Sequence, residues 1–312
     1  MWTFLSILDF IFIFRLYLPC GRGVFPARRP PDLITTMVTT MNTKMIRYAH
    51  KARLAGLAAL LGAGLGMTAG AAHAQDPQTL RFGLEASYPP FESKAPSGQL
   101  QGFDIDIGNA VCQRMQVKCV WVENSFDGLI AALEARKFDV IDSAMNITDK
   151  RRQQIDFTPA VYVMPIQMVA KRGSGLQPTP ASLKGKQIGV QQGTTQEDYV
   201  RKHWAPAGVS VVTYESQDQI FVDLASGRLD GAVQEVQTAT DGFLSKPQGK
   251  DYDFAGAPLK DPATLGEGTG FGLRKNDTAL KAKVDAALDS LRKDGTLTKL
   301  SMKYFGRDIV AH

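Results

Sequence analysis

Residues 117–143 read VKCVWVENSFDGLIAALEARKFDVIDS, and this stretch decides the fold. It predicts a strand over 117–123, a helix over 126–135 and a short strand over 139–143. Strands that alternate with helices of this length indicate α/β units and a largely parallel sheet.

The same arrangement occurs twice along the chain. The first unit begins with a strand over 79–85 and a helix over 103–115 and ends in FDVIDSA, and the second unit ends in LDGAVQE. The second unit is predicted as strand 186–190, helix 195–204, strand 209–214, helix 218–226 and strand 229–234. Further elements are expected at 161–171, 236–245, 271–273, 278–291 and 297–304. The repeat predicts two similar α/β lobes.

The leader of the chain has the organisation of a secretory signal peptide over residues 41–74. Four lysines and arginines precede an apolar run over 54–69, and Ala72-His73-Ala74 forms a cleavage site before Gln75. A membrane-spanning helix needs about 20 predominantly apolar residues, and this glycine-rich run is shorter. We therefore expect export, with cleavage after about Ala74.

Residues 1–40 are expected to be a non-native upstream extension. An over-long gene model explains them, with initiation at Met37, Met41 or Met45. The leader also carries the positive charge of the chain. Residues 1–74 hold 8 of the 36 lysines and arginines but 2 of the 31 acidic residues, which leaves 28 against 29 in residues 75–312. The sequence pI of about 9.0 is therefore no evidence for nucleic-acid binding, and none is expected.

Only two cysteines follow the leader, Cys112 and Cys119. In an oxidising compartment this pair predicts a disulfide that ties a helix end to the following strand. A metal pair is the alternative, but metal sites need further ligands, and the later histidines, His203 and His312, form no cluster. We expect no metal and no cofactor.

Candidate site residues lie just after the predicted strands, because open α/β sheets bind ligands beyond the carboxyl ends of their strands. After the first strand, Glu85 is followed by Tyr88 and Phe91 in a proline-stiffened loop. A surface turn explains these residues equally simply. The functional interpretation is an aromatic wall with one anion, which suits a cation on an apolar stem.

Two further segments carry groups that suit a carboxylate. In 146–152, Thr148 is expected to cap a short helix, and Arg151 lies within one turn of the strand end, where a guanidinium can clamp a carboxylate. In 191–197, the spacing of Thr194 and Glu197 fits a capping box, and such a helix start offers free N–H groups to an anion. A solvated basic helix face is the alternative for the first segment. A phosphate site is the alternative for the second, but no GxxxxGK[ST] or GxGxxG is present.

Glu235 ends the last strand of the second unit and could pair with an ammonium group; a carboxylate that interacts with a helix dipole is the alternative. The natural complement of two acids, one arginine and aromatic walls is an α-amino acid with a positive side chain. After the leader the sequence contains no GxSxG, no Cys/His pair and no metal cluster, so no enzyme class is indicated.

From about residue 79 to 309 the chain resembles the periplasmic amino-acid-binding proteins of ABC importers, bacterial solute-binding protein family 3. It is most similar to the lysine/arginine/ornithine and histidine binders. The matching stretches are GFDIDIGNAVCQRMQVKC (102–119), ITDKRRQQIDF (147–157), QGTTQE (192–197), SGRLDGAVQE (226–235), GTGFGLRKNDTALK (268–281) and LRKDGTLTKLSMKYF (291–305). The resemblance implies that Cys112 and Cys119 form the family's disulfide.

The resemblance also implies the roles of individual residues. Tyr88 and Phe126 would enclose the aliphatic stem of the ligand, and Glu85, with Ser143 beside it, would take the side-chain cation. Arg151 would hold the α-carboxylate together with Thr195 and Thr194, and Glu235 would receive the α-ammonium group.

This sequence departs from its relatives at several of these positions. Ala144 and Asn146 stand where the nearest relatives carry serines, Gln191 stands where an apolar residue is usual, and Gln196 is retained. Glu85 and Glu235 stand where relatives have aspartate. The departures leave the exact cationic amino acid open and would also admit an opine-like derivative.

The resemblance implies a type II periplasmic-binding-protein fold with a ligand cleft between two lobes and two hinge crossovers. Lobe 1 is expected to comprise 75–166 and 269–312, lobe 2 to comprise 167–259, and the second crossover to comprise 260–268. Ligand binding would close the cleft by a hinge motion.

The expected partners are a cationic amino acid and the permease subunits of an ABC importer, and the protein is expected to be a periplasmic monomer. An exported enzyme on the same fold, acting on a cyclic carboxylate with Glu235 as general acid, is the first alternative. A ligand-binding module for a partner sensor is the second.

Overall fold

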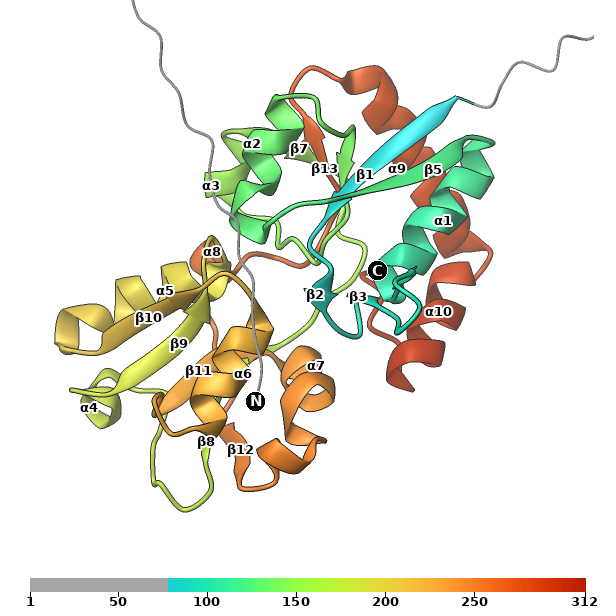
Figure 1. The fold of residues 1–312 in the computed structure, drawn as a ribbon. Helices are drawn as coiled ribbons and strands as arrows, with labels where there is room; N and C mark the ends of the chain where they lie inside the picture. The colour runs from blue at the N-terminus through green and yellow to red at the C-terminus, as the bar shows by residue number, and fades with distance from the viewer. Residues whose placement is uncertain (1–77) are drawn as a thin grey trace, which may run out of the picture. The chain divides into compact units, whose positions relative to one another are not determined.

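The computed structural model describes residues 78–312, which are coloured in Figure 1. The predicted upstream extension (1–40), the signal peptide (41–74) and its cleavage site after Ala74 lie outside the described residues. Within the described part of the chain, no helix is long and apolar enough to cross a membrane.

The first lobe is built on a five-stranded sheet in the order β5-β1-β6-β13-β7. Its strands are β1 (Thr79–Leu84), β5 (Lys118–Glu123), β6 (Val140–Ile141), β7 (Ile155–Phe157) and β13 (Gly272–Arg274). β1 runs parallel to β5 and β6, whereas β13 is antiparallel to both β6 and β7. The expectation of a largely parallel sheet therefore holds for the βαβ strands only. β13 departs from it because the chain returns there from the second lobe rather than through a crossover helix of the first.

The second lobe repeats this plan in the order β10-β9-β11-β8-β12. Its strands are β8 (Ile166–Lys171), β9 (Gln187–Gln191), β10 (Ser210–Tyr214), β11 (Gly231–Glu235) and β12 (Tyr252–Ala255). β9, β10 and β11 are parallel, and β8 and β12 are the antiparallel additions. The predicted pair of similar α/β lobes is confirmed.

Helices cover both faces of the first sheet. α1 (Phe103–Met115), α9 (Thr278–Lys293) and α10 (Thr296–Phe305) pack against one another, and α2 (Leu129–Glu134) follows a 3-10 turn (Phe126–Gly128). Phe103, Ile107 and Val111 recur every four residues on α1 and are fully buried, so this helix forms because one face joins the core. Figure 1 shows cyan, green and red elements in this lobe, since both ends of the described chain contribute to it.

The second lobe carries α4 (Pro180–Leu183), α5 (Thr195–His203), α6 (Gln217–Ala225) and α7 (Val236–Ala239). The expected helix over 236–245 is α-helical only in its first turn and continues as a π-helix over Thr240–Leu244. The Thr240 hydroxyl donates to the Val236 carbonyl (2.7 Å), which competes with the regular ladder at this point. Each lobe has two apolar clusters.

Several short elements had no clear signal in the sequence. They are the small sheet of β2 (Ser87–Tyr88), β3 (Glu92–Lys94) and β4 (Leu100–Gln101) and the helix α8 (Pro262–Leu265), whereas the short helix predicted after Thr148 is present as α3 (Asp149–Arg152). They are two to four residues long, which is too short for either hydrophobic period to be recognised. The predicted disulfide between Cys112 and Cys119 is present and joins the end of α1 to β5.

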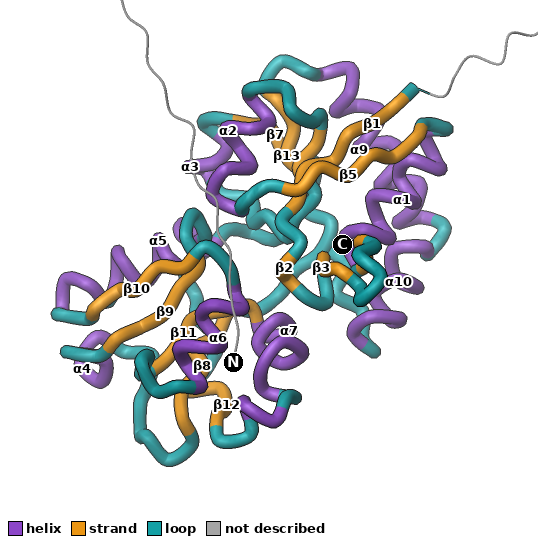
Figure 2. The backbone as a smooth tube through the Cα atoms, in the orientation of Figure 1, coloured by secondary structure: helices purple, strands orange, loops and turns teal. Residues whose placement is uncertain are grey.

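The chain passes twice between the two sheets, once between β7 and β8 and once between β12 and β13. Leu259 N–H donates to the Ile166 carbonyl (2.8 Å), and Thr269 N–H donates to the Tyr162 carbonyl (2.9 Å), so the two crossovers run beside each other. Figure 2 distinguishes the orange strands of both sheets from the teal connecting loops. The two-lobed fold with two crossovers is therefore confirmed.

Candidate ligand-binding site

A cavity lies between the lobes, beside the carboxyl ends of the central strands. β1, β6, β9 and β11 lead into the segments that line it or lie directly behind it. The lining residues are Tyr88, Phe126, Ser143, Ala144, Asn146, Arg151, Gln191, Thr194, Thr195, Gln196 and Glu235. Of the predicted site residues, the structure thus places all but Glu85 and Phe91 around this cavity, from segments up to about 150 positions apart.

Glu85 lies directly behind one of the lining residues. The Gln191 side chain donates from Nε2 to Glu85 Oε2 over 2.6 Å, and the Glu85 carboxyl group is 6% exposed. Burial raises the pKa of Glu85 to about 7, although the hydrogen bond from Gln191 acts in the opposite direction. The Glu85 carboxyl group is therefore close to the cavity, but the side-chain amide of Gln191, from the other lobe, is hydrogen-bonded to it.

The aromatic residues of the cavity are Tyr88 and Phe126. Phe91, which the sequence predicted in the same aromatic wall as Tyr88, packs beside Tyr88 with the ring centroids 5.8 Å apart, but it is fully buried and does not line the cavity. Its ring also stacks on Tyr162 with the centroids 5.4 Å apart and contacts Phe103 edge-on. The prediction that Phe91 lines the ligand site was wrong, because its ring is packed into the aromatic core of lobe 1.

Arg151 is fixed by a capped turn and by the opposite lobe. Thr148 caps α3 and accepts the Arg151 N–H (3.2 Å), as its position in the sequence predicts. The guanidinium donates to the carbonyl of Asn146 (2.7 Å) and, across the cleft, to that of Gly193 (3.0 Å). It also lies over the Phe126 ring, 5.4 Å from the centroid. Burial lowers the pKa of Arg151 to about 10, so the side chain stays charged at neutral pH.

The segment 191–197 forms the start of α5. Thr194 accepts the Glu197 N–H (3.2 Å), but Glu197 accepts from Gly193 N–H (2.7 Å) rather than from the N-cap N–H that a capping box requires. The reciprocal half of the predicted box is therefore displaced by one residue. Thr195 and Gln196 are buried beside the cavity and hydrogen-bonded to each other (3.1 Å).

Glu235 and Asn146 meet across the cleft. Asn146 donates from Nδ2 to Glu235 Oε1 (3.2 Å), while Glu235 Oε2 is buried without a hydrogen-bond partner. Burial raises the pKa of Glu235 to about 8, and the hydrogen bond from Asn146 only partly offsets this. An unpartnered buried carboxylate oxygen beside a cavity is a strong acceptor for a ligand's N–H group.

A cluster of three buried carboxyl groups stands behind the cavity wall, and the sequence analysis did not identify it. Ser143 donates to Glu92 (2.8 Å), and Asp104 accepts from Ala144 N–H (2.7 Å). Glu92, Asp104 and Asp142 are at most 2% exposed, and each has one oxygen without a partner. An acid inside the apolar run VIDSAM was a signal that could have been noticed.

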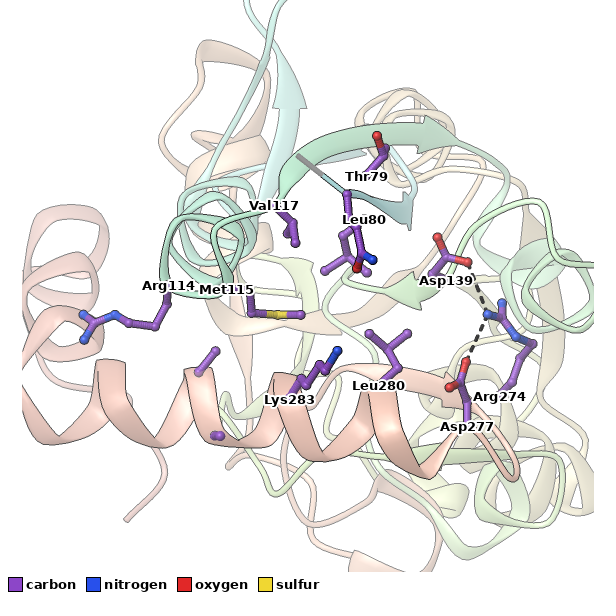
Figure 3. A pocket seen from close by; sticks show the side chains of 13 residues that line it. Thr79, Leu80, Arg114, Met115, Val117, Asp139, Arg274, Asp277, Leu280 and Lys283 are labelled. Atoms are coloured by element: carbon purple, nitrogen blue, oxygen red, sulfur yellow. Dashed lines mark hydrogen bonds and ion pairs between the residues drawn. The ribbon is translucent and has the colours of Figure 1, made fainter. Parts of the chain in front are cut away.

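A larger cavity lies elsewhere, at the amino end of β1 (Figure 3). It has a volume of about 620 Å³ and an apolar floor that includes Leu80, Met115 and Leu280. Arg274 at its edge pairs with Asp139 (3.2 Å) and Asp277 (3.3 Å). It lies away from the carboxyl ends of the strands, so we do not assign the ligand site to it.

With this geometry established, the family is clear. Residues 80–307 match the model of the bacterial extracellular solute-binding proteins, family 3, and the chain belongs to this family. The lysine/arginine/ornithine-binding periplasmic protein of Escherichia coli K12 is 50% identical over 238 residues, which cover 76% of this chain and 92% of that protein. The histidine-binding periplasmic protein of Salmonella typhimurium is 48% identical over 242 residues, covering 78% and 93%.

A similarity to solved structures agrees with the sequence relatives. An ancestral arginine-binding protein bound to arginine is 35% identical and superposes with a TM-score of 0.69. The match covers 74% of this chain and 100% of that chain. The resemblance inferred from the sequence motifs is thereby confirmed.

Proposed function

We propose that this protein is the periplasmic substrate-binding component of an ABC importer and binds a cationic L-amino acid. One observation carries the proposal: a buried arginine and two buried carboxyl groups, Glu85 and Glu235, surround one cavity between the lobes. The named functions of the relatives, which bind lysine, arginine, ornithine or histidine, support the same class.

Each end of an amino acid would have its own partners. Arg151 would bind the α-carboxylate, together with Thr194 and Thr195 at the start of α5. Glu235 would receive the α-ammonium group on its unpartnered oxygen. Glu85 would attract the side-chain cation.

The remaining lining residues would define the shape of the cavity. Tyr88 and Phe126 would enclose the aliphatic stem of the ligand. Ser143, Ala144, Asn146, Gln191 and Gln196 would complete the wall and the hydrogen bonds.

The proposed transport cycle uses the two lobes as rigid bodies. Lobe 1 comprises 75–166 and 269–312, lobe 2 comprises 167–259, and residues 260–268 form one of two hinges. The closed form, sealed by contacts such as Lys150 to Asp198 (2.8 Å), would be recognised by the permease subunits. We further propose that the protein is monomeric and reaches the periplasm after cleavage near Ala74.

A second candidate function is catalysis, and the pKa of Glu235, about 8, is the observation that favours it. A carboxyl group that stays protonated near neutral pH can act as a general acid on a cyclic carboxylate. A binding role explains the buried Glu235 equally well, because the ammonium group of a ligand would pair with it. Incubation with a cyclic carboxylate such as prephenate distinguishes catalysis from binding, and we expect no turnover.

Calorimetry tests the proposed function. The protein is purified from the periplasm, freed of carried-over ligand, and titrated with lysine, arginine, ornithine, histidine and glutamine. We expect tight binding of at least one cationic amino acid. Glu85→Gln should lose the cationic ligands selectively, while Arg151→Ala should lose every amino acid. Tight binding of glutamine with no binding of any cation would overturn the proposal.

A further inference from the structure

Two glutamine side chains from the second lobe form a hydrogen-bonded chain that ends on Glu85. Gln217, the first residue of α6, donates from Nε2 to Gln191 Oε1 (2.9 Å), and Gln191 donates from Nε2 to Glu85 Oε2 (2.6 Å). Gln217 and Gln191 are each 1% exposed. Gln217 does not line the cavity, so any influence on a ligand must pass through Gln191.

The surroundings fix the orientation of both amides. Gln191 Nε2 also donates to the backbone carbonyl of Glu215 (3.1 Å), so its NH₂ group faces two acceptors. Its oxygen must therefore point to Gln217, which can satisfy that oxygen only by donating. Without Gln217, the buried oxygen of Gln191 would lose its donor, so the amide would be held on one side only and its contact with Glu85 would be less firmly fixed.

The charged groups around Glu85 make this orientation important. Asp218 at the start of α6 and Asp127 in the 3-10 turn both act on Glu85 as like charges, and Glu92 of the buried cluster is a further acidic neighbour. Within residues 78–312, no lysine or arginine forms an ion pair with Glu85. The Gln191 amide is thus the side-chain donor that favours the ionised carboxylate.

We propose that Gln217 is a positioning residue for ligand selectivity: by orienting Gln191, it keeps Glu85 ionised and so favours a cationic side chain in the cavity. This inference rests on the proposed function. Gln217 lies outside the cavity, on α6, and no sequence motif connects that helix with the ligand.

The sign of the pH effect follows from the burial of Glu85. Burial raises the pKa of Glu85 to about 7, and the Gln191 hydrogen bond lowers it. Loss of the donor should raise the pKa further, so a larger fraction of Glu85 is protonated at neutral pH. Affinity for a cation should then fall at pH 7 and recover at higher pH.

The test compares Gln217→Met with Gln248→Met, an exposed glutamine of the same lobe that has no hydrogen bond to Gln191 or Glu215. In Gln217→Met, lysine affinity at pH 7 should fall about tenfold or more, as expected for a lost hydrogen bond to a charged group. Glutamine affinity should change much less, and the pH midpoint of lysine binding should rise. Gln248→Met should leave all three quantities unchanged.

Gln217→Glu provides a second variant in case the first does not fold. Its carboxylate would attract the Gln191 NH₂ group and turn the amide oxygen towards Glu85, so the same selective loss is expected. An equal loss of lysine and glutamine affinity, or an unchanged pH midpoint, would overturn the positioning role. If the unmodified protein binds no cationic amino acid at all, the proposed function fails instead, so the two failures are distinguishable.

Discussion

Two buried carboxyl groups at the cavity are expected to make ligand binding depend on pH. Glu85 and Glu235 lie at or behind the cavity wall, and burial raises the pKa of the first to about 7 and of the second to about 8. Both groups are therefore partly protonated near neutral pH. A cation that binds beside either one favours its ionised form, so ligand binding is linked to proton release.

We predict that binding of a cationic amino acid at pH 7 releases protons, and that affinity rises from pH 6 to about pH 8. Calorimetric titrations in two buffers with different ionisation enthalpies measure the number of protons released. Glu235→Gln should remove most of this release, because Glu235 has the higher pKa. Identical binding enthalpies in both buffers would contradict the linkage.

Asp142 illustrates a buried acid that costs stability. It is 2% exposed, and its Oδ2 atom has no partner. Burial, with Asp104 nearby, raises its pKa well above the usual range. Asp142 does not destabilise the folded protein below a pH of about 4, the pKa of aspartate in the unfolded chain. The free energy of unfolding then falls as the pH rises through the higher pKa of Asp142 in the folded protein.

We therefore predict that Asp142→Asn raises the free energy of unfolding at pH 7.5 by about 1–3 kcal/mol, the cost of an uncompensated buried polar group. The gain should shrink towards pH 4. Urea unfolding at several pH values measures it. Asp289→Asn, which removes an exposed partner of Lys293, is the control and should change little. A gain independent of pH would refute the assignment.

At the level of single helices and strands, two helix caps and one disulfide hold local segments in place. Thr148 and Thr194 begin the helices that carry Arg151 and Thr195 to the cavity. These caps depend on residues three positions apart, which is why the sequence indicated them. The disulfide acts elsewhere, because it joins the end of α1 to β5 and neither cysteine lines the cavity.

We predict that replacing both Cys112 and Cys119 with serine lowers the free energy of unfolding by about 2.5 kcal/mol, from the chain entropy of the loop that they close. Ligand affinity should be unchanged within about twofold, because neither cysteine lines the cavity. This limit is well below the 1.4 kcal/mol that corresponds to a tenfold change in affinity. Denaturant unfolding and calorimetry measure the two effects. Reductant should destabilise the unmodified protein by a similar amount and leave the variant unaffected.

At the scale of the whole molecule, the lobes approach so closely that one position cannot carry a side chain. A Cβ atom on Gly193 would lie 2.9 Å from the Cα and Cβ atoms of Asp127 in the opposite lobe. Gly193 also has a φ of 76°, which favours glycine by itself. Gly185, in the same lobe, shares this geometry with a φ of 75° but has nothing within 4 Å.

We predict that Gly193→Ala weakens ligand binding at least tenfold, because it hinders closure of the lobes, whereas Gly185→Ala leaves affinity unchanged. Both variants should lose about 1–2 kcal/mol of stability from the left-handed backbone conformation. Calorimetry and small-angle scattering with ligand measure affinity and closure. Equal affinities in the two variants would show that the contact between Gly193 and Asp127 does not limit closure.

The sequence by itself determined what depends on neighbouring residues. Alternating strands and helices predicted two α/β lobes, and the segments after the strands contained the residues that meet at the cavity. Only the tertiary structure decided the rest. It packed Phe91 against Tyr88 and Tyr162 in the core, away from the cavity lining, and added antiparallel strands to both sheets. It also joined Glu85 to Gln191, 106 positions away, and gathered Glu92, Asp104 and Asp142 behind the wall. Such contacts depend on how segments far apart in the sequence pack together and exclude water. Local hydrophobic periods and helix caps carry no information about that packing.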